Sequence, residues 1–199
     1  PERLVRTNGI ITLLDLRAAN VGSRRTEGLE LSLRGNADLF GGTLTAGLDG
    51  TYLLKKREKF LPAAPFGPSQ VGVFSFAGDL GLEWKHNAFI TWTDETWTVS
   101  LSQIFRNGYR NQQLPGIANG TVVRPDSELR VDDYITYNFS LGARVNDQMT
   151  LTFGVRNLFD TDPPFAVTYD SNTGSGSSWE PRVADPRGRS YTLSATVKF

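Results

Sequence analysis

The stretch Gly188-Arg-Ser-Tyr-Thr-Leu-Ser-Ala-Thr-Val-Lys-Phe199 decides the fold of this chain, because from Tyr191 onward it alternates apolar and polar residues without a slip. The apolar set is Tyr191, Leu193, Ala195, Val197 and Phe199. Successive side chains of a β-strand point to opposite faces of the sheet, so the stretch predicts a strand with one apolar face. In a transmembrane β-barrel that face contacts lipid, the Ser/Thr face lines a wet interior, and an aromatic residue lies at the bilayer surface.

Seven other segments are predicted to be strands, and most of them repeat this alternation. They cover about 10–17, 28–34, 43–54, 84–93, 97–106, 135–145 and 149–156, and the first of them is apolar on both registers. The connections alternate between short turns near 36–42, 93–96 and 146–148 and long loops near 55–78, 107–132 and 160–187. Outer-membrane barrels have short periplasmic turns and long extracellular loops. The predicted fold class is therefore all-β, an antiparallel transmembrane β-barrel with about eight strands in this chain.

Aromatic residues recur at a spacing that fits a membrane. Trp84 and Trp92, Trp97 and Phe105, and Tyr191 and Phe199 are pairs whose members are eight residues apart. At about 3.3 Å per residue and a tilt of about 40°, such a pair spans roughly 20 Å of height, close to the apolar band of a barrel. Trp92 and Trp97 flank one short turn, so we expect them to lie side by side.

Composition excludes several classes of function. No apolar run approaches the ~18 residues of a membrane-spanning helix. The 21 basic and 21 acidic residues cancel, which leaves no electrostatic argument for a nucleic-acid partner. The chain has no cysteine and one histidine, so we expect neither a metal site nor a cofactor. No credible catalytic set is present, and the chain is predicted not to be an enzyme.

Several motifs, in a fixed order, resemble the C-terminal end of TonB-dependent outer-membrane receptors. They are Val155-Arg-Asn-Leu-Phe-Asp160, Pro163-Pro-Phe165, Asp185-Pro-Arg-Gly-Arg-Ser-Tyr191 and the terminal Phe199. Upstream, Arg25-Thr-Glu-Gly-Leu-Glu-Leu31, Trp84-Lys-His-Asn87 and Trp97-Thr-Val-Ser-Leu-Ser102 are similar to segments of late barrel strands in that family.

The resemblance implies a 22-stranded barrel that holds an N-terminal plug, with residues 1–199 as the last third of the barrel and the plug absent from this segment. It implies a bacterial outer-membrane location and uptake of a scarce nutrient, such as a siderophore, vitamin, carbohydrate or peptide. The implied partners are the rest of the barrel and the plug, the TonB complex, outer-membrane lipid, the nutrient, and the barrel assembly machinery. That machinery would read Tyr191, Leu193, Val197 and Phe199.

Two groups of residues are candidates for contact with the nutrient. Aromatic side chains in the long loops are the first, because exposed aromatics are costly unless they are covered or used: Phe66, Tyr109, Tyr169 and Trp179. They could instead pack the loops together. The second group faces the predicted lumen and comprises Glu30, Arg34, Asp49, Arg106, Arg144 and Arg156. These charges could pair with the plug or line a path for the substrate. We favour the first interpretation.

Two other features have structural interpretations. The Asn157-Leu-Phe-Asp160 segment is predicted to make local turn hydrogen bonds where a strand ends. His86 shares a register with Trp84 and Trp92, which predicts that it points toward lipid or the headgroup border.

A second hypothesis is a complete small barrel of eight strands with a structural or enzymatic role, because eight strands can close around their own side chains. A soluble β-sandwich is less well supported, since it does not account for the paired aromatics.

Overall fold

The computed structural model describes residues 4–8, 10–14, 22–59, 64–75, 80–112, 120, 130–168 and 176–198. All regular structure in these ranges is β-structure, and it forms three sheets. Among the described residues, no helix has the length and apolar character needed to cross a bilayer.

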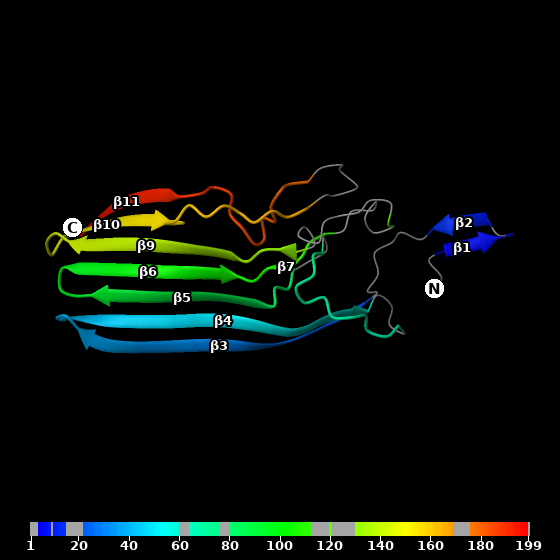
Figure 1. Ribbon diagram of the computed structural model, residues 1–199, viewed down its shortest axis with the longest axis horizontal. Helices are drawn as coiled ribbons and strands as arrows, with labels where there is room; N and C mark the ends of the chain where they lie inside the picture. Colours follow the sequence, from blue (N-terminus) through cyan, green and yellow to red (C-terminus); the bar gives the residue numbers. More distant parts are fainter. Residues whose placement is uncertain are drawn as a thin grey trace.

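The main sheet holds seven antiparallel strands in the order β11-β10-β9-β6-β5-β4-β3 (Figure 1). The bounds are β3 Ser23–Leu39, β4 Gly42–Lys59, β5 Trp84–Thr93, β6 Trp97–Arg106, β9 Tyr134–Arg144, β10 Met149–Arg156 and β11 Ser190–Val197. Short turns join strands at the end of the sheet where β11 finishes, and the long connections lie at the opposite end (Figure 1). The predicted all-β antiparallel architecture is confirmed.

The register separates two faces across all seven strands, and the pairing of Val155 with Phe139 and with Tyr191 extends it to β10 and β11. One row runs Leu33, Leu48, Ala88, Gln103 and Tyr137, and the row beside it runs Ser32, Asp49, Asn87, Ile104 and Thr136. The only shift in this sheet is a bulge between Glu27 and Gly28. Each alternating segment of the sequence therefore presents its apolar set to the same side, which we call the outer face, and its polar set to the other, the inner face.

The β3–β4 hairpin is longer than the sequence predicts. Its turn is only Phe40 and Gly41, which have φ of 53° and 78°, and two-residue hairpin turns favour such positive values. At the other end β4 includes the basic cluster 55–57, which we expected in a loop. There, Arg24 pairs with Glu58 and Lys55 with Glu27 across the two strands. These ion pairs extend the hairpin beyond its apolar part.

The first predicted strand, over 10–17, is not part of the main sheet. Residues Ile10–Leu14 form β2, which pairs with β1, Leu4–Thr7. Asn8 has a φ of 52°, a conformation that Asn adopts more readily than most residues, and it turns the chain into this local hairpin. A strand that is apolar on both registers has no preferred face, so alternation does not direct it into the main sheet. It pairs instead with β1, the strand just before it in sequence.

The second long loop also contains β-structure that we did not expect. Tyr109–Arg110 forms β7 and Arg130–Val131 forms β8, and the two pair in a sheet of their own.

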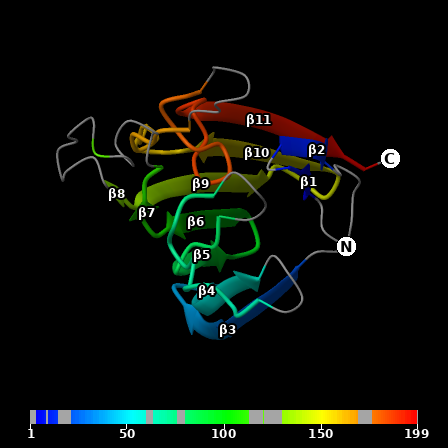
Figure 2. The ribbon, with the colours of Figure 1, turned by 90° about the vertical axis from the view of Figure 1, so that its right-hand side faces the viewer.

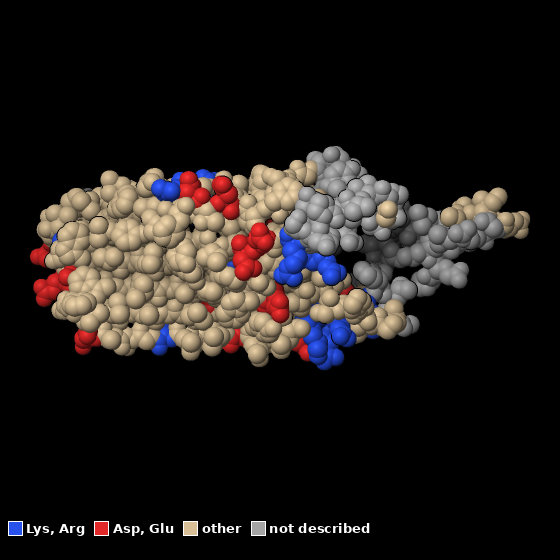
Figure 3. All heavy atoms as spheres, in the orientation of Figure 1, with Lys and Arg blue, Asp and Glu red and all other residues tan. Residues whose placement is uncertain are grey.

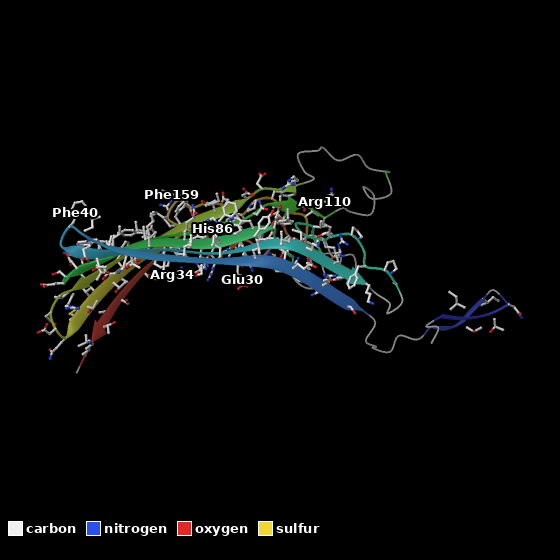
Figure 4. All side chains as sticks on the ribbon, turned by 90° about the horizontal axis from the view of Figure 1, so that it is seen from below. Glu30, Arg34, Phe40, His86, Arg110 and Phe159 are labelled. Atoms are coloured by element: carbon white, nitrogen blue, oxygen red, sulfur yellow. The ribbon has the colours of Figure 1, made fainter. Side chains whose placement is uncertain are left out.

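The main sheet is open, with β3 and β11 as its edges. This contradicts the hypothesis of a closed eight-stranded barrel made by this chain alone. The sheet is curved, as the end-on view shows (Figure 2). In the view from below, β11 bends toward the side of Glu30 and Arg34, so the inner face is the concave one (Figure 4).

The sheet and the loops bury apolar side chains very differently. The outer face of β3 exposes Leu29 by 61% and Leu33 by 56%, and the space-filling view shows a broad surface with few charges (Figure 3). The compact hydrophobic cluster lies instead at the long-connection end and consists of Leu80, Tyr109, Val131, Tyr134, Ala166, Val183 and Ala184, with Phe74 and Leu82 packed against it. We call this cluster the loop core.

Candidate functional site

The charged residues predicted to face the lumen all lie on the inner face. Glu30, Arg34 and Asp49 alternate with the exposed leucines of β3 and their partners on β4, and Arg106, Arg144 and Arg156 occupy the corresponding positions of β6, β9 and β10. Figure 4 shows Glu30 and Arg34 on one side of the sheet and His86 and Phe159 on the other. That the inner face lines a lumen stays a prediction.

Arg34 is the centre of a cluster near the middle of the β3–β4 hairpin. It forms an ion pair with Asp49, which also accepts a 2.8 Å hydrogen bond from Ser32. The Arg34 guanidinium lies 5.2 Å from the centre of the Phe89 ring, a cation–π arrangement. A Cβ atom at position 47 would lie 2.5 Å from the Phe89 ring, so Gly47 leaves the space that this ring fills. Asp49 thus neutralises Arg34 within the wall.

Arg106 has a different environment, because among the described residues it has no acidic partner. Its guanidinium donates a 2.9 Å hydrogen bond to the backbone oxygen of Phe105. It lines a cavity of about 430 Å³ between β9 and segment 181–188, and also neighbouring cavities of about 400 and 330 Å³. Lys85 lines the two smaller cavities as well. Arg106 and Lys85 therefore offer positive charge to whatever fills this space, although Asp185 lines the largest of these three cavities and Glu30 and Asp49 line the next.

Glu30 and Arg144 also have no ion-pair partner in the described part of the chain. Glu30 lines the 400 Å³ cavity with Asp49 and Lys85. Arg144 lies near the short-turn end, beside Asp147 and Gln148. The inner face thus carries charges of both signs that the sheet itself does not neutralise.

Arg156, at the end of β10, belongs to a clasp that holds segment 185–189 over the inner face. Its guanidinium lies 3.4 Å from Asp185, and Arg187 binds the same carboxylate at 2.6 Å. The side-chain and backbone hydrogen bonds of Arg187 lower the pKa of Asp185 to about 2. The Tyr134 hydroxyl donates a hydrogen bond of 3.3 Å to the Asp185 carbonyl. We call Arg156, Asp185, Arg187 and Tyr134 the clasp.

The Asn157-Leu-Phe-Asp160 turn has the structural role that the sequence predicts. Asn157 is 5% exposed, and its side chain accepts from the Thr161 backbone nitrogen at 2.9 Å and donates to the Thr161 oxygen at 3.0 Å. Asp160 accepts a 2.7 Å hydrogen bond from the Arg189 backbone nitrogen. The turn therefore closes on itself and ties the end of β10 to the start of β11.

The aromatic loop residues have separate surroundings. Tyr109 is 1% exposed inside the loop core, and burial raises its pKa. Phe66 is 38% exposed, with the Lys59 ammonium 5.6 Å from its ring centre. Trp179 is half-buried, and Tyr169 lies outside the described residues. Contact of these residues with a ligand stays a prediction, and for Tyr109 it requires the loop core to open.

Sequence reasoning missed an ion pair in the third loop whose acidic member is buried. Glu180 is 4% exposed and accepts hydrogen bonds of 2.8 Å from Arg182, whose guanidinium lies 5.6 Å from the Phe74 ring centre. Burial opposes ionisation of Glu180, but the hydrogen bonds from Arg182 outweigh it and lower the pKa of the carboxyl. The spacing of these charges resembles that of many exposed pairs, so nothing in the sequence signals the burial of Glu180.

The predicted assembly signal is described in part. Tyr191, Leu193 and Val197 lie on the outer face of the edge strand β11, and the Tyr191 ring stacks on Phe153 with centres 6.3 Å apart. Phe199 lies outside the described residues. The role of this strand in assembly stays a prediction.

Comparisons with known proteins agree with this architecture. The sequence model of the family described as TonB dependent receptor-like, beta-barrel matches residues 4–158. Among solved structures, the chain is similar to a mutant of the ferric enterobactin receptor from Pseudomonas aeruginosa, with a TM-score of 0.53 and 16% sequence identity. The similarity covers 87% of this chain but only 22% of that receptor, and at this identity it shows the fold alone. No curated protein matches the chain.

Proposed function

Because the chain belongs to the family of TonB-dependent receptor-like β-barrels, we propose that its sheet is part of the wall of an outer-membrane receptor that imports a scarce nutrient. The observation that carries this proposal is the register of seven strands, shifted only at the Glu27–Gly28 bulge, with an apolar outer and a polar inner face. A soluble protein would have to cover the exposed leucines of the outer face, whereas lipid covers them in a membrane. The segment would supply wall and extracellular loops.

The inner face supports a partner inside the barrel. Arg106, Arg144 and Glu30 have no ion pair among the described residues, and a charge in a confined space is stabilised by an opposite one. We propose that a plug satisfies most of these charges. Arg106 lies where loop and wall meet, so it is the residue that a nutrient entering between loops and plug would reach.

Uptake energised by TonB completes the proposal. The candidate nutrients are a siderophore, a vitamin, a carbohydrate or a peptide. A ferric siderophore is the first to test, because the similar solved receptor carries the name of one. Capture would occur at the loops, and movement of the plug, driven from the periplasm, would release the nutrient inward.

The test is a nutrient-uptake assay in the native bacterium with radiolabelled ferric siderophores, cobalamin and oligosaccharides. Deletion of the gene for this chain should abolish uptake of one nutrient, and loss of TonB should abolish the same uptake. Normal uptake of every nutrient in the deletion strain would refute the receptor role. Uptake that survives loss of TonB would refute only the energy source.

A further inference from the structure

A chain of hydrogen bonds crosses the outer face, where the surrounding side chains are apolar. Trp84 Nε1 donates to His86 Nδ1 at 2.8 Å, His86 Nε2 lies 2.8 Å from Gln103 Oε1, and Gln103 Nε2 donates to Tyr137 Oη at 2.6 Å. The four residues come from β5, β6 and β9. We call them the outer relay. Polar groups in a lipid-facing position are costly unless they are satisfied, so their presence here requires an explanation.

The outer relay has only one possible direction. The indole nitrogen of Trp84 can only donate, so His86 Nδ1 must be the unprotonated acceptor. A neutral imidazole then carries its proton on Nε2, which donates to the Gln103 carbonyl oxygen. The Gln103 amide donates in turn to the Tyr137 oxygen. The last proton, that of the Tyr137 hydroxyl, has no acceptor among the described residues.

Aromatic rings hold the outer relay in place. The Phe105 ring stacks on His86 at 5.0 Å with an interplanar angle of 7°, and Phe159 meets Tyr137 edge-on at 5.3 Å. The Trp84 ring covers Gly50, where a Cβ atom would lie 2.3 Å from the indole. Figure 4 shows His86 and Phe159 on the same side of the sheet. The Tyr137 hydroxyl is therefore presented at a defined place rather than on a mobile side chain.

Depth and charge indicate the missing acceptor. Tyr137 is six residues from Ala143, the partner of Trp97, which places it about 15 Å above the short-turn aromatic level at a strand tilt of about 40°. Phe105 on the neighbouring strand β6 is eight residues from Trp97 and marks the upper aromatic level at roughly 20 Å. Tyr137 therefore lies roughly 5 Å below the upper boundary of the apolar band and below the charged headgroups. No outer-face position of β5, β6 or β9 holds Lys or Arg, so a phosphate would have no counter-charge there. An uncharged acceptor fits better.

We infer that the Tyr137 hydroxyl binds an acyl carbonyl oxygen of a membrane lipid on the long-loop side of the bilayer, with the outer relay as its support. Acyl carbonyls lie at the boundary between headgroups and hydrocarbon and can accept without carrying charge. Each donor polarises the next in such a chain, which strengthens the terminal bond. This inference rests on the membrane location that belongs to the proposed function.

The test uses the complete receptor polypeptide, folded in membranes, and two probes that share one headgroup. Diacyl phosphatidylethanolamine has acyl carbonyls, and its dialkyl ether analogue has none. Native mass spectrometry of the receptor released from an equal mixture of the two should show the diacyl lipid retained about five- to tenfold more, the factor expected for one hydrogen bond. The substitution Tyr137→Phe should abolish this preference.

Tyr52→Phe is the matched control. Tyr52 shares the outer face, but its hydroxyl already donates to Glu83 at 3.0 Å, so its loss should leave the lipid preference unchanged. Equal retention of both lipids by the unsubstituted receptor, or an unchanged preference in Tyr137→Phe, would overturn the inference. The inference would also be overturned if Tyr137→Phe removed a co-purifying protein and left lipid retention unchanged. Failure of the polypeptide to insert into membranes would instead refute the proposed function.

A second measurement tests the direction of the outer relay itself. The chain has one histidine, so ¹⁵N labelling of histidine followed by NMR assigns the ring of His86 after subtraction of a His86→Gln spectrum. A proton on Nε2 is expected in the unsubstituted receptor. A proton on Nδ1 would leave the Trp84 indole without its acceptor and would overturn the inference.

Discussion

The strand wall and the loop core are held together by different forces. The wall is one layer thick, its strands pair by backbone hydrogen bonds, and its apolar side chains point outward. In the loop core, by contrast, Tyr109 and Val131 are each 1% exposed and lie among apolar neighbours. The wall therefore depends on a membrane for its hydrophobic contacts, and the loop core supplies its own. Changes that affect one region should leave the other intact.

Loss of the largest buried side chain should produce the largest effect. We expect Tyr109→Ala to destabilise the loop core by about 3–5 kcal/mol, because it leaves a cavity in a closed cluster. Hydrogen exchange should then show lost protection at 109–110 and 130–131, with β5 and β6 still protected. Tyr109→Phe is the control, since the Tyr109 hydroxyl is buried without a partner in the described part of the chain and its removal should cost little. Lost protection in β5 would show that the two regions are not independent.

A charge on the outer face should destabilise the wall and spare the loop core. Leu101 lies at the middle of β6 on the outer face, opposite Ile90 and Phe139. Leu101→Arg should reduce the stability of the protein folded in lipid vesicles by about 2–4 kcal/mol. Ser140→Arg introduces the same charge on the inner face and should change this stability by less than about 0.5 kcal/mol. Urea titration in vesicles measures both, and equal effects would contradict the assignment of the faces.

The turn where the two regions join should give an intermediate effect. Asn157→Ala removes both side-chain hydrogen bonds to Thr161 and places alanine at a φ of 51°, so we expect a loss of about 1–3 kcal/mol. Asn157→Gly should recover the backbone part of this loss, because glycine adopts positive φ without strain. The same titration separates the two contributions. If both variants lose the same amount, the backbone conformation makes no contribution.

The smallest effect is expected from acid acting on the clasp. Ionised Asp185 is favoured in the folded protein, because its pKa is lowered from 3.8 to about 2. The stabilisation is therefore complete above about pH 4 and is lost as the pH falls toward 2. Hydrogen exchange of Arg187 and Arg189 amides should rise over this range. In Asp185→Asn the exchange rate of these amides should already be raised at neutral pH and should not change with acid. If the variant keeps the acid response of the unsubstituted protein, a group other than Asp185 causes it.

The wall was predictable from the sequence because apolar and polar side chains alternate regularly along its strands. The alternations in 84–93, 97–106 and 135–145 give strands, faces and order directly, and the structure confirms each of them. Segment 10–17 lacks a polar register, so the sequence could not show that it pairs locally with 4–7.

The loop core could not be predicted in the same way. Its contacts join Leu80, Tyr134 and Val183, which are far apart in sequence and follow no period. Of the candidate site, the shared face of the charged residues followed from alternation. The burial of Tyr109 and the partners of Arg156 depend on how the loops pack, and only the Asp185-Pro-Arg-Gly-Arg189 motif gave a local signal for the clasp.

The continuous register has a mechanical consequence. Between β4 and β11 the hydrogen-bond ladders run without a bulge, and the strands lie parallel to one long direction of the sheet (Figure 1). A pulling force along that direction shears every rung of a ladder at once, whereas a force across it peels an edge strand one rung at a time. The sheet should therefore resist a force along its length better than a force across it.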